Sequence, residues 1–199
     1  MKLVDTPTDG HKWVQVESAA KRIIDRALFQ EAVDDFDFDS YFQRYAPQAR
    51  QVITEVPGVH LVGVEGMRYP AMYAPPSTVY LSGKLKESAS FALKVLAHEC
   101  GHVYRDRTAG PIYNYYLCKD TAGNPVAEEE AARRIVIEEN EATNWANEQF
   151  RRIGFSKMVP SFPADTQRYI GWIQQIRSKG IDTTEGLIRF FANMAGFRV

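Results

Sequence analysis

Cysteine, histidine and net charge are all scarce in this chain. Its 199 residues include two cysteines, Cys100 and Cys118, and four histidines, and the formal net charge at pH 7 is −1. Two cysteines do not make a disulfide framework, and their scarcity favours a reducing compartment. A net charge so close to zero gives no electrostatic reason to expect a nucleic acid or an anionic membrane as a direct partner.

Long apolar runs are lacking as well. No stretch approaches the ~20 consecutive apolar residues that a membrane-spanning helix needs. The first ten residues, MKLVDTPTDG, lack the apolar run of a signal peptide. We therefore expect a cytoplasmic protein without a membrane partner. The hydrophobic content of 45% and the charged content of 25% are typical of a globular protein, and the length suits a single domain over residues 1–199.

Hydrophobic periodicity predicts helices towards both ends of the chain and short strands between them. Strands are expected over 58–66 and 78–83, with a proline-rich loop between them and a second loop over 108–126. Helices are expected over 17–33, 39–53, 86–106, 127–152, 164–180 and 183–197. This order predicts an α+β fold, because strands and helices do not alternate as in βαβ units. We divide the domain into an N-terminal helical segment (1–57), a core (58–150) and C-terminal helices (151–199).

An acidic stretch, DDFDFDS at 34–40, places acids on alternate residues, as in a calcium-binding loop. The stretch lacks the turn glycine and the closing glutamate that such a loop needs. We therefore interpret it as helix capping and solvated charge.

The most informative stretch is HECGH at 98–102. His98 and His102 are four residues apart on a predicted helix, so both imidazoles can reach one zinc ion. Glu99, between them, would take a proton from the water that the zinc binds and pass it to a leaving amine. Gly101, which has no Cβ, would let a neighbouring element approach closely. The alternative interpretation is an ordinary helix with two histidines packed in the core.

A third zinc ligand is most readily found on the predicted helix 127–152. Glu138 falls within its apolar stripe and Glu141 borders that stripe beside Trp145, so helical geometry alone slightly favours Glu138. His11, His60 and Cys118 are weaker candidates, because nothing in their spacing connects them to the histidine pair.

The motif HECGH, followed by a glutamate on a later helix, resembles the gluzincin metallopeptidases, and most closely the ImmA/IrrE-like group. The resemblance covers residues 58–150 and rests on STVYLSGKLKES, FALKVLAHECGHVY and EATNWA. It implies Glu141 as the third ligand, with His98 and His102, and Zn²⁺ as the cofactor. The implied fold is zincin-like, with a small mixed or antiparallel sheet packed on the active-site helix. The strand 78–83 would then be a sheet edge that pairs with an extended peptide.

The resemblance implies a zinc-dependent endopeptidase that hydrolyses a protein or peptide substrate, with Glu99 as the catalytic base. The alternative is a non-hydrolytic zinc-containing regulatory or partner-binding protein of the same fold. A deformylase-like hydrolase is disfavoured, because no cysteine precedes residue 100. The terminal helical segments are candidates to cover the cleft.

Several supporting roles stay open at this stage. Asp106, four residues after His102, either orients that imidazole or is a solvated charge between two arginines. Candidate donors to a developing oxyanion are Tyr104, Tyr113, Tyr115, Tyr116 and His60. Cys100 is expected to be a small buried thiol.

Overall fold

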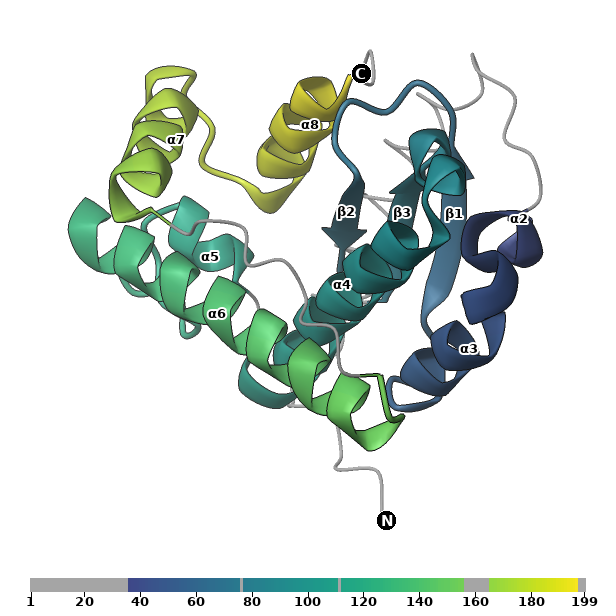
Figure 1. Cartoon of the computed structure of the whole chain (residues 1–199). Coiled ribbons are helices and arrows are strands. Elements are labelled where there is room, and N and C mark those ends of the chain that lie inside the picture. The colour runs from purple at the N-terminus through teal and green to yellow at the C-terminus, as the bar shows by residue number, and fades with distance from the viewer. Residues whose placement is uncertain (1–35, 76, 111, 156–164, 197–199) are drawn as a thin grey trace.

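A small sheet with helices packed against both of its faces forms the centre of the protein (Figure 1). The computed structural model describes residues 36–75, 77–110, 112–155 and 165–196, so the helix predicted over 17–33 lies outside the described residues. The α+β class is confirmed. The described elements are α2 (Phe38–Phe42), η1 (Gln43–Tyr45), α3 (Ala46–Thr54), β1 (His60–Val64), β2 (Ala71–Ala74), β3 (Thr78–Ser82), η2 (Gly83–Glu87), α4 (Ala89–Ala109), α5 (Tyr113–Tyr116), α6 (Glu128–Arg152), α7 (Thr166–Ser178) and α8 (Thr184–Ala195).

The sheet is mixed, and β3 is its central strand. The strand β1 pairs with β3 in parallel, and β2 pairs with β3 in antiparallel register from Ala71 opposite Leu81 to Ala74 opposite Thr78. The prediction that 78–83 forms a sheet edge is therefore wrong. The cause is β2, which lies in the segment read as a proline-rich loop. A four-residue strand is too short to show a period of its own, and only its pairing with β3 defines it.

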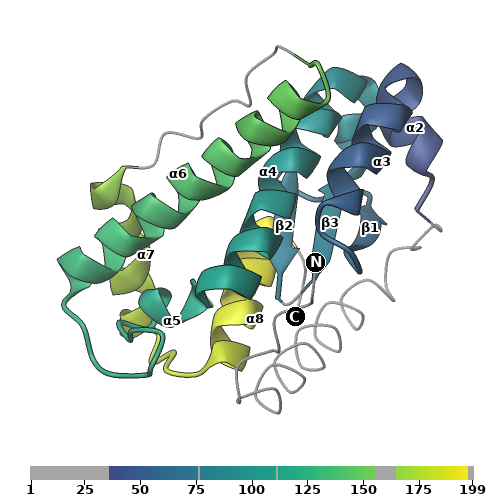
Figure 2. The same ribbon diagram turned by 90° about the horizontal axis from the view of Figure 1, so that it is seen from below.

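The two faces of the sheet are apolar because alternate residues of β3 point to opposite sides. Val79 and Leu81 belong to the core that the sheet forms with α2, α3 and α4. Tyr80, between them, packs in a second cluster with Ile188 and Ala192 of α8. The sheet is thus covered by α4 on one face and by α8 on the other, and Figure 2 shows α3, α4 and α6 side by side.

The helix α4 is the most central element of the fold. It packs against β2, β3, α2, α3 and α6, and its residues from Leu93 to Val103 are buried, except Lys94. It ends at Gly110, whose φ of 87° is a conformation that glycine adopts without strain. Because HECGH lies within this buried stretch, its polar side chains are held inside the protein.

A close approach between α4 and α6 occurs at Gly101. A Cβ atom built on Gly101 would lie 2.4 Å from the carbonyl oxygen of Ala142 in α6, far inside van der Waals contact. The expectation that Gly101 lets a neighbouring element approach is confirmed. This contact sets how near the side chains of α6 come to those of HECGH.

Two further findings concern the expectations about calcium and membranes. The side chain of Asp37 caps α2 by accepting a hydrogen bond from the backbone N–H of Ser40 at 3.1 Å, in agreement with the capping interpretation of the acidic stretch. None of the described helices is long and apolar enough to cross a bilayer.

We predict that Gly101→Ala destabilises the protein, because its new methyl group meets a backbone carbonyl that cannot rotate away. The expected loss in free energy of unfolding is about 1–3 kcal/mol, the usual cost of overpacking. The matched control is Gly171→Ala in α7, where a Cβ would meet no atom within 4 Å. That variant should gain about 0.5–1 kcal/mol from helix propensity. Urea denaturation of the metal-free proteins measures both, and equal stabilities would contradict the close-contact account.

Candidate metal centre

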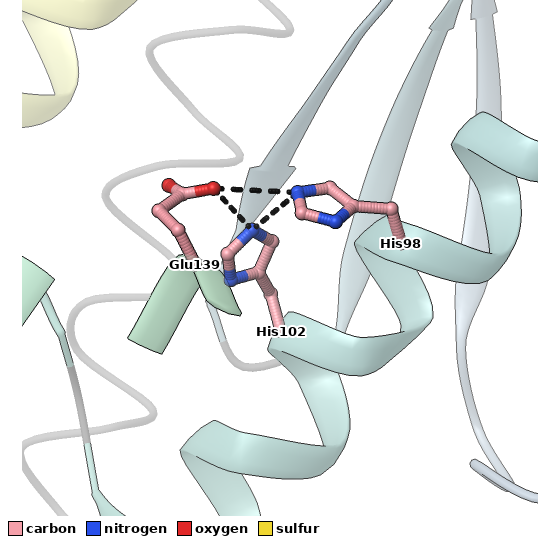
Figure 3. Close-up of side chains that lie close together, drawn as sticks. All are labelled: His98, His102 and Glu139. Atoms are coloured by element: carbon pink, nitrogen blue, oxygen red, sulfur yellow. Dashed lines mark hydrogen bonds and ion pairs between the residues drawn. The ribbon is translucent and has the colours of Figure 1, made fainter. Parts of the chain in front are cut away.

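His98, His102 and Glu139 converge on one point between α4 and α6 (Figure 3). The two Nε2 atoms lie 3.1 Å apart. Glu139 Oε2 lies 3.3 Å from His98 Nε2 and 3.5 Å from His102 Nε2. Within the parts of the chain that the structure describes, these residues form the one group of three potential ligands.

The arrangement fits a zinc ion. Two imidazole nitrogens and a carboxylate oxygen are ligands that zinc prefers, and three protein ligands leave the fourth tetrahedral position open. Ligand atoms about 2.0–2.1 Å from a tetrahedral ion lie about 3.3 Å from one another, which the three separations of 3.1, 3.3 and 3.5 Å match. Without an ion, three polar groups this deeply buried would have to compensate one another's desolvation.

The third ligand in this arrangement differs from the one that the resemblance implied. Glu141 does not join the histidines, because its carboxylate Oε2 lies 2.5 Å from the guanidinium of Arg105. Glu138 also pairs with Arg105, at 3.0 Å. The structure thus brings Glu139, which neither line of sequence reasoning proposed, to the two histidines in place of Glu141 or Glu138.

A signal for Glu139 is present in the sequence. Glu139 lies four residues after Ile135 and three before Ala142, and both of these residues are fully buried, so it shares their face of α6. When Trp145 is counted in the apolar stripe of this helix, the apparent centre of the stripe moves towards Glu138. In the structure Trp145 is buried in the core around α4, where it stacks on Tyr104, which is 40% exposed.

Each histidine has a contact behind its ring. His98 Nδ1 lies 3.2 Å from Thr143 Oγ1 on α6, so its Nε2 is left to face the group. His102 stacks against Tyr73 of β2, with ring planes only 6° apart. The Tyr73 hydroxyl donates a 2.7 Å hydrogen bond to Asp106 Oδ2. Asp106 thus contacts Tyr73, the residue that stacks on His102, and its negative charge raises the pKa of His102. The reading of Asp106 as a solvated charge is therefore wrong.

Glu99 lies beside the group and is only 9% exposed. Burial raises the pKa of its carboxyl, and the neighbouring His102 and His98 oppose that rise. A backbone hydrogen bond from Tyr73 of β2 also opposes the rise in the pKa of Glu99. A buried carboxylate with a raised pKa, next to the histidines, is suited to accept and donate a proton.

The charges of the metal-free site are strongly coupled. Burial by itself lowers the pKa of His102, but the Glu139 carboxylate, Glu99 and Asp106 outweigh this effect and raise it to about 9. Burial opposes ionisation of Glu139, and the two histidines overcome it, so the pKa of Glu139 lies well below its usual range. The metal-free centre therefore holds an imidazolium against a carboxylate, and a metal ion has to displace a proton.

The remaining candidate residues lie elsewhere or are otherwise engaged. His60 is exposed at the start of β1, Cys118 lies outside the group, and His11 is outside the described residues. Cys100 is fully buried, and burial raises the pKa of its thiol, as expected for an inert core cysteine. The Tyr113 hydroxyl donates a 2.6 Å hydrogen bond to the carbonyl of Tyr73.

The other candidate oxyanion donors are not distinguished by their contacts. Tyr116 is buried in an aromatic cluster with Tyr169, Trp172 and Phe191, and Tyr115 is half-buried at the edge of that cluster.

Comparisons with models of protein families, with curated proteins and with solved structures found no match to this chain. The functional interpretation therefore rests on the geometry of the site and on the motifs in the sequence.

We predict that replacing Glu139 removes the metal and that replacing Glu141 does not. Zinc content is measured on protein purified without chelator. The wild type and Glu141→Gln should hold about one zinc per chain, because Glu141 faces Arg105 and not the histidines. Glu139→Gln should lose most of it. Loss in Glu141→Gln and retention in Glu139→Gln would restore the assignment from the resemblance.

Zinc affinity should depend on pH because His102 is protonated in the metal-free protein. Below its pKa of about 9, zinc has to displace that proton, so affinity should rise about tenfold for each pH unit between pH 6.5 and 8.5. Chelator competition across this range measures the slope. Calorimetry at pH 7 in buffers of different ionisation enthalpy should detect the released proton. A flat profile would contradict the His102–Glu139 pairing.

Proposed function

We propose that the protein is a zinc-dependent peptidase of the gluzincin type. The observation that carries the proposal is the convergence of His98 and His102 with Glu139, at separations of 3.1–3.5 Å, directly beside the buried Glu99. The helix α4, which bears three of these residues, packs against a small mixed sheet, in line with a zincin-like fold. HECGH and its surroundings also resemble the ImmA/IrrE-like group, although that resemblance pointed to Glu141 and not to Glu139 as the third ligand.

The residues divide the chemistry among them. His98, His102 and Glu139 would hold the ion, which would supply Lewis-acid polarisation of a water molecule and of the peptide carbonyl. Glu99 accepts the proton of the attacking water and later delivers it to the amine that leaves. Tyr73 positions one of these groups, because its ring stacks on His102.

Access for a peptide is restricted in the described conformation. The side chains of His98 and His102 are 3% and 11% exposed, and that of Glu139 is 18% exposed. Tyr73, on β2 at the side of the sheet, uses its backbone N–H for Glu99 and its carbonyl for the Tyr113 hydroxyl. A peptide strand that added to β2 would compete with these two hydrogen bonds. They would therefore have to break before such a substrate could bind.

The restricted access favours a second candidate function, a zinc-containing regulatory or partner-binding protein that does not hydrolyse its ligand. In that case zinc would stabilise the α4–α6 pair, and Glu99 would be a structural carboxylate held by β2. The two candidates share the metal site and differ only in the role of Glu99.

We predict that zinc-loaded protein cleaves members of a mixed peptide library and that Glu99→Gln reduces kcat about 10²–10⁴-fold, the usual contribution of a general base. Glu99→Gln should keep its zinc, since Glu99 is not a ligand. The control Glu138→Gln, which changes a carboxylate paired with Arg105 outside the group, should stay active. Fully zinc-loaded wild type that cleaves no peptide would favour the non-hydrolytic candidate.

A further inference from the structure

A hydrogen bond from α5 occupies the edge of the sheet beside the metal centre. The Tyr113 hydroxyl donates it to the backbone carbonyl of Tyr73, at 2.6 Å. Among the strands that the structure describes, β2 pairs only with β3, so its other side is an edge of the sheet. Residues of an antiparallel pair that do not bond to the partner strand point their backbone groups outwards. The Tyr73 carbonyl is such an outward group, and Tyr113 covers it.

The covered carbonyl belongs to the residue of β2 that borders the candidate metal centre. The Tyr73 ring lies parallel to the ring of His102, with centroids 6.2 Å apart. Its hydroxyl donates a 2.7 Å hydrogen bond to Asp106. A peptide that adds to a sheet edge binds through main-chain hydrogen bonds. To run along β2 next to His102, its backbone N–H groups need the Tyr73 carbonyl as an acceptor.

We propose that α5 is an autoinhibitory latch, in which Tyr113 closes the β2 edge and a zinc ion or a peptide reaches the histidines only when this hydrogen bond opens. The proposal rests on the metal site of the proposed function and adds a control on access to it. It accounts for the low exposure of the three candidate ligands, whose side chains are at most 18% exposed.

The connections of α5 suit a segment that moves as a unit. It is four residues long, and the chain turns on either side of it, with positive φ angles of 87° at Gly110 and 52° at Cys118. Tyr113 also meets Phe191 of α8 edge-on, with ring centroids 6.3 Å apart. Because turns separate α5 from α4, the latch can open without a change in the helix that carries the two histidines.

The Tyr113 phenol keeps the proton that it donates. Burial raises the pKa of this phenol, and the negative charges of Asp106, Glu99 and Glu139 raise it further. Ionisation of Tyr113 therefore does not open the latch near neutral pH. A competing donor, such as the backbone N–H of a peptide, has to take its place on the Tyr73 carbonyl.

The test compares Tyr113→Phe with Tyr115→Phe on the full chain, by the rate of zinc release. Each variant deletes one phenol hydroxyl from α5, and of these two hydroxyls that of Tyr113 bonds to β2. Zinc-loaded protein is mixed with an excess of the coloured chelator pyridylazoresorcinol, and stopped-flow absorbance follows the transfer. Tyr113→Phe should release zinc about three- to tenfold faster, the factor that one hydrogen bond of ordinary net strength contributes. Tyr115→Phe should match the wild type.

The equilibrium affinity separates a latch from damage to the ligands. A latch acts on entry and exit alike, so Tyr113→Phe should also bind zinc faster by the same factor and leave the dissociation constant unchanged. An unchanged release rate in Tyr113→Phe, an equal acceleration in Tyr115→Phe, or a loss of affinity that by itself explains the faster release would overturn the latch. Thermal unfolding of the metal-free variants shows whether each is folded.

The failure of the latch and the failure of the proposed function give different results. Zinc exchange does not depend on hydrolysis, so a protein that binds zinc and cleaves no peptide still tests the latch. Absence of zinc binding in the wild type would overturn the metal site, and the latch with it.

Discussion

The contact between Gly101 and Ala142 governs how closely Glu139 approaches His98 and His102 in the candidate metal centre. The group draws ligands from two helices, and the distance between α4 and α6 decides whether a glutamate side chain can reach an imidazole nitrogen. Because a Cβ at residue 101 would lie 2.4 Å from the Ala142 carbonyl oxygen, only glycine permits this approach. Glu139 precedes Ala142 by three residues, so the contact and the ligand share one face of α6.

Around that contact, apolar packing encloses the polar side chains of His98, His102 and Glu139. The sheet and α3 pack on α4, and α5, α7 and α8 build an aromatic cluster beside α6. Charged groups that are buried in this way need partners. Asp106 has the Tyr73 hydroxyl as its partner, and Glu139 has the two imidazoles of His98 and His102. The acids on the outer side of the group, Glu138 and Glu141, are neutralised by Arg105 instead.

Long periodic elements were predictable from the sequence, and so was the part of the site that they carry. The helices α4 and α6 lie close to their expected positions, and HECGH placed His98 and His102 on one face of α4. The strand β2 was not predictable, since four residues between prolines show no period and its pairing with β3 is a tertiary effect. Because β2 pairs with β3, the segment 78–83 lies at the centre of the sheet and not at its edge.

Glu139 was missed as a candidate ligand for a related reason. Three acids, Glu138, Glu139 and Glu141, lie within four residues of each other on α6, so a small error in the direction of the apolar stripe selects the wrong one. The choice depends on Arg105, which lies on α4 and draws Glu138 and Glu141 to its side. A contact between residues 33 or more positions apart in the sequence leaves no trace in local periodicity.

The central claim is that His98, His102 and Glu139 hold one zinc ion. The most direct test is anomalous scattering from crystals of the zinc-loaded protein, recorded on both sides of the zinc absorption edge. The account predicts a single strong anomalous peak per chain, within about 2.0–2.2 Å of both Nε2 atoms and of a Glu139 carboxylate oxygen. A zinc peak bound by Glu141 or away from α4, or well-ordered histidines with no peak after zinc is added, would contradict it.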